Sequence, residues 1–397
     1  MNKKTSLTII FITVFIDLLG FGLLIPILPT FASKILFISD FEIGILVAAF
    51  SFMQFIFNPI VGNYSDTIGR RPIILASLLL TAVSYIIFSF SHSFIMLLIS
   101  RIIAGLGGSN ISAAQAYIAD ITETKDRTKG MGIIGTAFAL GFVFGPMLGG
   151  FLAHYGYEVV GYVAAGFSFT AFIFAVFFLK ESLVKNKIEP QKRQRLLSIN
   201  VFQELFSQKR LAFFVLVYFV IVFSMANIYG TFALLGYKVY NLNDRQIGLL
   251  YTIMGLASAF VQSGLLRYLL KYFKDEKLLL FSMVFMMFGI GGLPFGYNFV
   301  GVAIISAISS FGTGSLQPII LGLISKEINQ ENQGRLLGLN QSMSALARVF
   351  GPIWGGFAFD YLGYEFPFLT GGIFTFITLI ISFYFLKSKK IKSFSNV

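Results

Sequence analysis

Apolar residues in this chain gather in long runs that are separated by short polar breaks. Each run has about 20 residues, the length that an α-helix needs to cross the hydrocarbon core of a bilayer. We therefore expect an all-α integral membrane protein. The pattern predicts twelve transmembrane helices, over residues 7–29, 42–63, 72–91, 94–119, 130–154, 160–180, 210–236, 246–267, 278–297, 299–325, 334–358 and 366–387.

The composition agrees with this pattern. Hydrophobic residues make up 56% of the chain and charged residues only 12%, whereas a soluble domain carries about 25% charged residues. An ordinary cytosolic enzyme, a disordered regulator and a disulfide scaffold are thereby excluded. The first apolar run contains Asp17 and no clear cleavage site, so we expect it to remain as a span and not to be removed as a signal peptide.

The basic residues predict the orientation in the membrane. The chain has 30 Lys and Arg against 18 Asp and Glu, a net charge of +12. The Lys and Arg residues lie in the short breaks and not on one basic face, which argues against a nucleic-acid partner. With the N-terminus in the cytoplasm, 25 fall in predicted inner segments and 3 in outer loops. Because inner loops are enriched in Lys and Arg, both termini are predicted to be cytoplasmic.

The two halves of the chain repeat one another. The pattern V-F-G-P-x-x-G-G occurs at 143–150 and again 206 residues later at 349–356. The polar segment between Lys180 and Arg210 separates six spans from six, so we expect two pseudo-symmetric six-helix bundles at 1–181 and 210–397, joined by a cytoplasmic loop at 182–209. Within this loop, 197–206 is amphipathic and is expected to lie on the inner membrane surface. Duplicated bundles are typical of transporters that work around a central site.

Two motifs resemble those of the major facilitator superfamily. The loop between spans two and three carries the pattern G-x-x-x-D-x-x-G-R-R, supplied by Gly62, Asp66, Gly69, Arg70 and Arg71. Span five carries the pattern of the superfamily's antiporters, supplied by Gly141, Gly145, Pro146, Gly149 and Gly150. The resemblance implies that the loop motif, with Asp120 and Arg127, forms an inner latch that holds the outward-open state. The alternative reading of the arginine pair is a positive loop that only sets topology.

Three further segments, 16–29, 101–122 and 334–352, are similar to those of the twelve-span drug:proton antiporters, among them the tetracycline efflux carriers. Those carriers have an acid inside span three and another inside span nine. This chain has Ser84 at the place in span three and no acid in span nine. The resemblance therefore does not extend to tetracycline itself, carried as a metal chelate. It implies a multi-pass protein of the bacterial inner membrane, and we expect a monomer without cofactor or bound metal.

Asp17 is the only carboxylate well inside a predicted span, about 10 residues from its start and roughly 15 Å deep. An ionisable group at that depth costs at least about 2.5–3.5 kcal/mol, so it needs a function or a partner. We hypothesise that Asp17 takes up and releases the coupling proton. The alternative is a structural carboxylate permanently paired with an arginine. Arg101 is the candidate partner, unless its side chain extends to the outer headgroups.

The remaining polar residues inside spans are candidates for a substrate cavity or for contacts between helices. Arg348 could bind an anionic group, could pair with Asp17 in one state, or could simply extend to the headgroups or pack between helices. The candidates are Asn110, Gln115, Tyr229, Gln262, Gln317, Asn340, Gln341 and Arg348. As a set they are too sparse for a sugar, whose hydroxyls each need a partner.

The predicted function is proton-coupled efflux of an amphipathic or lipophilic small molecule by alternating access, with cations among the candidate substrates. One alternative is a proton-coupled symporter of a metabolite or an osmolyte. Another is a membrane receptor or scaffold that transports nothing. An integral-membrane enzyme is not expected, because the spans contain no paired acids or histidine cluster, and the chain has two His and no Cys.

Overall fold

The computed structural model describes residues 3–123, 127–183, 208–327 and 333–394. These residues are helical almost throughout and contain no β-strand. They form two compact units, one made of Met1–Lys192 with Phe232–Thr252 and the other of Arg193–Thr231 with Ile253–Val397. The predicted amphipathic stretch at 197–206 lies outside the described residues, and the predicted bundle boundaries stay a prediction.

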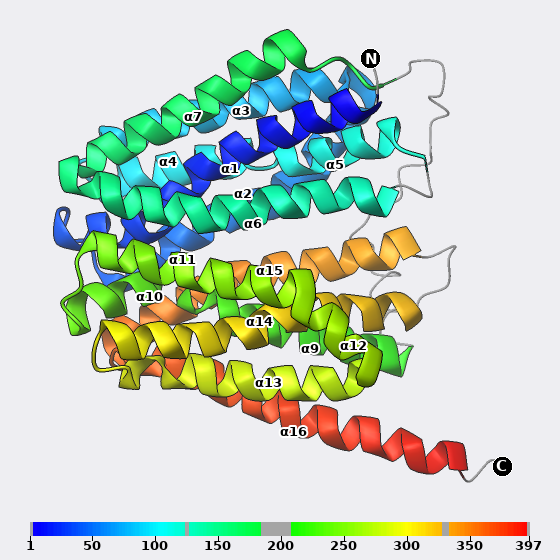
Figure 1. Ribbon diagram of the computed structural model, residues 1–397. Helices are drawn as coiled ribbons and strands as arrows, with labels where there is room; N and C mark the ends of the chain where they lie inside the picture. Colours follow the sequence, from blue (N-terminus) through cyan, green and yellow to red (C-terminus); the bar gives the residue numbers. More distant parts are fainter. Residues whose placement is uncertain (1–2, 124–126, 184–207, 328–332, 395–397) are drawn as a thin grey trace. The chain divides into compact units, whose positions relative to one another are not determined.

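The first unit is built around α1, which packs against α6 and α7, as Figure 1 shows. The helix α3 in turn packs on α7 and on α4. The helices of this unit are α1 (Lys3–Lys34), α2 (Asp40–Ile68), α3 (Arg70–Ser89), α4 (Phe94–Gly107), α5 (Asn110–Ile121), α6 (Arg127–Leu152), η2 (Ala153–Tyr155) and α7 (Tyr157–Phe178), together with η4 (Leu235–Val239) and the first half of α11 (Asp244–Phe260).

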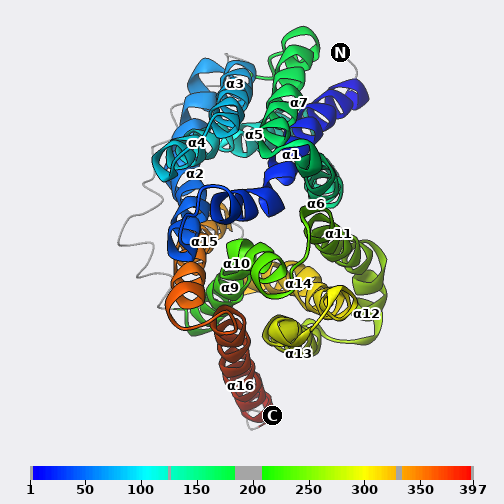
Figure 2. The same cartoon turned by 90° about the vertical axis from the view of Figure 1, so that its left-hand side faces the viewer.

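The second unit repeats the same kind of packing. Figure 2 shows α13 beside α14, and α13 also packs against α16, while α15 packs on α9. The elements of this unit, besides the second half of α11, are α9 (Lys209–Ala226), most of α10 (Ile228–Leu234), η5 (Val261–Leu265), α12 (Leu266–Tyr272), α13 (Asp275–Gly292), η6 (Leu293–Phe295), α14 (Phe299–Glu327), α15 (Gln333–Tyr361) and α16 (Phe366–Phe394).

The predicted all-α membrane fold is confirmed. In the described part of the chain, eleven helical segments are long and apolar enough to cross a membrane, and α15 covers the remaining predicted span, the eleventh in order, at 334–358. Large apolar side chains face outward on both units, including Phe177, Phe260 and Phe288, which are 75%, 67% and 66% exposed. Such a surface suits lipid, because contiguous apolar area of this kind is rare on proteins that face water.

Span four differs from the prediction, because it consists of two helices. The chain leaves α4 at Gly107 and enters α5 at Asn110. Gly107 and Gly108 weaken the helix here, since glycine costs about 1 kcal/mol relative to alanine within a helix. Gln54 of α2 donates from Nε2 to the Gly108 carbonyl at 3.1 Å. The break is therefore satisfied by a neighbouring helix, as an interruption inside a membrane must be.

The glycines of span five form a contact face on α6. A Cβ at Gly145 would lie 2.5 Å from the Cα of Gly22, and one at Gly149 would meet the carbonyl oxygen of Leu23. The adjacent face meets α11, because a Cβ at Gly150 would meet the carbonyl oxygen of Asp244. Small residues thus let α6 approach the backbones of two helices at once.

The second copy of the pattern has the same role in the second unit. Gly351 and Gly355 of α15 lie against Asn227, where span seven is interrupted between α9 and α10. The side chain of Asn227 is fully buried, and its Nδ2 donates to the carbonyl of Pro367. In both units the repeated glycines therefore replace a side-chain layer with backbone contact.

Candidate functional site

The buried carboxylate of Asp17 lies among three helices of the first unit. Its side chain is near the middle of α1 and the residue is only 6% exposed. Asn110, the first residue of α5, donates from Nδ2 to Oδ2 at 2.9 Å. Ser168 of α7 donates from Oγ to Oδ1 at 2.8 Å. The break in span four thus positions the amide that meets the carboxylate.

Arg101 is close to this cluster but does not pair with Asp17. No ion pair joins the two side chains, which both lie in the described part of the chain; the guanidinium instead donates from Nη2 to Ser100 Oγ at 3.5 Å. Tyr85 of α3 interacts electrostatically with both Asp17 and Arg101. Since Arg101 is only 4% exposed, its side chain is enclosed by protein and does not extend along a lipid-facing surface.

The sequence identified Asp17 and Arg101 but missed two residues of the cluster. Ser168 and Tyr85 lie in spans six and three, and nothing in the spacing of the sequence brings them next to span one. Asn110 was a candidate for the substrate cavity, and the structure makes it a partner of Asp17. Its position directly after a Gly-Gly-Ser run was the available signal, because such a run interrupts a helix.

The loop motif forms a second cluster at the predicted cytoplasmic end. Arg70 donates from Nε to Asp120 Oδ2 at 3.0 Å and from Nη1 to Ser65 Oγ at 2.6 Å, and it also pairs with Asp66. Arg71 does not join these acids, because its Nη2 donates to the carbonyl of Val176 at 2.7 Å. The side chain of Arg127, the remaining predicted member, lies outside the described residues.

Glu181 is a member of this cluster that the sequence did not reveal. Its carboxylate accepts from the backbone N–H groups of Arg70 at 2.9 Å and Arg71 at 3.2 Å. These groups open α3 and have no partner within the helix, so the carboxylate caps it. Gly69 has φ +120° and a Cβ there would meet Glu181, whereas nothing lies within 4 Å of a Cβ at Gly62. Of these two motif glycines, only Gly69 is thus required sterically.

A third cluster lies at the opposite end of the first unit. Lys238 of η4 donates to both oxygens of Asp40 at 2.7 and 2.8 Å. The hydroxyl of Tyr157 donates to Asp244 at 2.9 Å, and Lys34 lies 3.8 Å from the same carboxylate. The sequence placed the two lysines in outer loops but gave no partner for either.

The other cavity candidates divide by exposure. Asn340 is fully buried, and within the described part of the chain neither its Oδ1 nor its Nδ2 has a hydrogen-bond partner. Gln115, Gln262, Gln317, Gln341 and Tyr229 are exposed, and Arg348 is half-buried. In the second unit Gln317 donates to Tyr218 Oη at 3.3 Å, and Tyr229 interacts electrostatically with Arg348.

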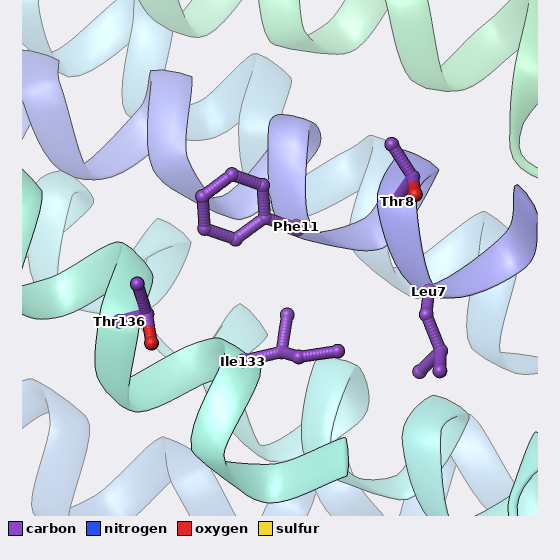
Figure 3. A pocket seen from close by; sticks show the side chains of 5 residues that line it. All are labelled: Leu7, Thr8, Phe11, Ile133 and Thr136. Carbon is purple, nitrogen blue, oxygen red and sulfur yellow. The ribbon is translucent and has the colours of Figure 1, made fainter. Parts of the chain in front are cut away.

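A small pocket between α1 and α6 offers no chemistry. It has a volume of about 200 Å³ and is lined by Leu7, Thr8, Phe11, Ile133 and Thr136, as Figure 3 shows. None of these side chains carries a charge, and we assign the pocket no role. Among the described residues, no group of three or more His, Cys, Asp or Glu side chains is arranged to hold a metal ion.

Comparison with known proteins identifies the family. Residues 10–307 and 240–396 match the Major Facilitator Superfamily. The chain belongs to this superfamily. A class H tetracycline resistance protein of Pasteurella multocida is 30% identical over 367 residues, which cover 91% of this chain and 90% of that protein. Multidrug resistance protein 1 of Bacillus subtilis (strain 168) is 30% identical over 371 residues, which cover 93% and 94%.

A solved structure agrees on the fold. The nucleoside transporter NupG superposes with a TM-score of 0.76 over 98% of this chain and 100% of that chain, at 14% sequence identity. As a member of the superfamily with relatives named for drug resistance, the protein is a multi-pass membrane transporter and not an enzyme, as the sequence predicted. Its resemblance to drug:proton antiporters agrees with the names of its relatives.

Proposed function

We propose that this transporter exports an amphipathic or lipophilic small molecule in exchange for protons, by alternating access of two six-helix bundles. The observation that carries the proposal is the environment of Asp17, a buried carboxylate held by two neutral partners. The relatives named for tetracycline and multidrug resistance support export as the direction of transport.

The partners of Asp17 suit both of its protonation states. A hydroxyl can donate to a carboxylate and can accept from a carboxylic acid, so Ser168 serves either form. Asn110 donates through Nδ2 while its buried Oδ1 has no partner. A half-turn of the amide would present that oxygen to a protonated Asp17. A permanent arginine pair would instead favour the ionised form, and none is present at Asp17 in the described chain.

The proton-coupling role is tested with the variant Asp17→Asn in inside-out membrane vesicles that are acidified by respiration. Addition of an exported compound should alkalinise the lumen in the wild type, and this signal should be lost in Asp17→Asn. Asp17→Glu keeps an acid and should restore part of the signal. Asp360→Asn, at the exposed end of α15, is the matched control and should retain it.

Three outcomes contradict the proposal. Accumulation that still follows the pH gradient in Asp17→Asn removes this residue from the coupling. Compound and protons that enter together indicate a symporter. The absence of transport for a broad panel of compounds supports a receptor or scaffold.

The cluster around Arg70 is proposed as the inner latch. Its charges join the end of α2 and the start of α3 to the end of α5, and such contacts between moving elements give two discrete states. We further propose a monomer in the bacterial inner membrane with both termini in the cytoplasm. Because the chain has no Cys, single cysteines introduced at Thr67 and Asn241 can test this topology by labelling from either side.

A further inference from the structure

Arg348 is a charge in the middle of α15, the helix that covers the eleventh predicted span. In α15 it lies 15 residues after Gln333 and 13 before Tyr361, about 22 Å and 20 Å from the two ends. An arginine side chain can reach the headgroups from near a helix end but not from this position. The charge must therefore be accommodated at the level of the bilayer interior.

Among the described residues of its own half, no acid neutralises Arg348. From Arg210 onward these carboxylates are Asp244, Asp275, Glu276, Glu327, Asp360 and Glu365, and each lies at a helix end or in a connection between helices. No ion pair involves Arg348 in the described part of the chain. Its only hydrogen bond there runs from Nη1 to Ser344 Oγ at 2.7 Å, one turn earlier in α15.

The neutral side chain of Tyr229 in α10 interacts electrostatically with this guanidinium and also with Tyr218 of α9. Gln317 of α14 donates in turn to the Tyr218 hydroxyl at 3.3 Å. Arg348 is half-buried and Tyr229 is 39% exposed, so the group is not sealed inside the protein. An accessible guanidinium with four N–H groups left to donate has the geometry for a planar anion.

We propose that Arg348 is the subsite for an anionic group, such as a carboxylate, on the transported amphipathic molecule. This inference deepens the proposed function and rests on it. A planar anion can accept two parallel hydrogen bonds from the guanidinium. The sequence admitted cations among the substrates, but an unpaired positive charge at the site repels them.

A matched series of probes separates charge from hydrophobicity. Biphenyl-4-carboxylate, its methyl ester and the biphenyl trimethylammonium analogue share one apolar body and differ in charge. Binding to the purified protein is followed by quenching of Trp354, the only Trp of the chain, which lies six residues after Arg348, about 9 Å along the same helix. Transport of each probe is followed in inside-out vesicles.

The wild type should bind the carboxylate about tenfold or more tightly than the ester, as expected for hydrogen bonds to a charged group. Arg348→Gln should abolish this preference while ester binding stays unchanged, and Arg348→Lys should retain part of it. Arg267→Gln removes an exposed arginine of α12 and should retain the full preference.

Several results overturn the inference. Equal binding of the three probes by the wild type, or equal weakening of all three by Arg348→Gln, shows that Arg348 recognises no anion. Loss of proton coupling for the ester in Arg348→Gln shows that the arginine acts in proton coupling together with Asp17 and not in anion recognition. Export of the ester but not of the carboxylate refutes the anion subsite and leaves efflux standing. A carboxylate preference in binding without transport of any probe instead supports the anion subsite and refutes efflux.

Discussion

Replacement of Gly145 by alanine tests a close backbone contact between α1 and α6 in the first unit. The added Cβ would lie 2.5 Å from the Cα of Gly22, 2.7 Å from its carbonyl carbon and 3.0 Å from the N of Leu23. All three are backbone atoms of α1, so no flexible side chain can turn aside. Carbon atoms prefer about 3.5–4.0 Å, and α1 and α6 would have to separate by roughly 1 Å.

Two effects of this substitution oppose one another. Alanine is favoured over glycine within a helix by about 1 kcal/mol. Overpacking typically costs about 1–3 kcal/mol, and here the separation also loosens the most extensive helix pair of the unit. The overpacking is expected to win, so Gly145→Ala should lower the free energy of unfolding.

The control lies on the same helix. Gly135 of α6 is exposed, and nothing lies within 4 Å of a Cβ built there, so Gly135→Ala gains helix propensity without a clash. Unfolding of both variants is measured in mixed micelles of increasing denaturing detergent. Gly145→Ala should be less stable than Gly135→Ala by about 1 kcal/mol or more. Equal stability would show that α1 and α6 are not packed through this glycine.

Two further predictions concern charges at helix ends. Glu181→Ala should lower the melting temperature, because α3 loses the acceptor of its first N–H groups, a change that costs about 0.5–2 kcal/mol. The melting temperature of Glu181→Gln should lie between those of Glu181→Ala and the wild type. An unchanged melting temperature in Glu181→Ala would refute the cap. Arg210 lies 2.9 Å from both Glu276 and Glu327. Arg210→Gln should therefore lower the free energy of unfolding by up to about 1 kcal/mol at low salt and by less at high salt. A loss of stability that does not depend on salt would contradict an electrostatic origin.

The sequence predicted the spans and their repetition well, because both are recorded in local patterns. A run of about 20 apolar residues has few readings other than a membrane helix. The paired glycine patterns mark positions of close helix contact, as the contacts of Gly145 and Gly355 show. Local patterns of this kind can be recognised without knowing which helices pack against one another.

The partners of Asp17 could not be predicted in the same way. Asn110 and Ser168 are 93 and 151 residues away in the chain, and only the packing of three helices brings them together. Arg101 was the obvious partner by charge, yet charge alone does not fix where a side chain points. The capping role of Glu181 was missed for the same reason, because α3 begins 111 residues earlier.

The two-sided glycine face of α6 limits how this protein can accept mutations. A helix that is crowded on one side can usually shift toward the other, but Gly145 faces α1 while Gly150 faces α11. Movement that relieves one neighbour therefore presses on the other. Suppressors of a larger residue here should arise in pairs, with one smaller side chain on each flanking helix, and single compensating changes should be rare.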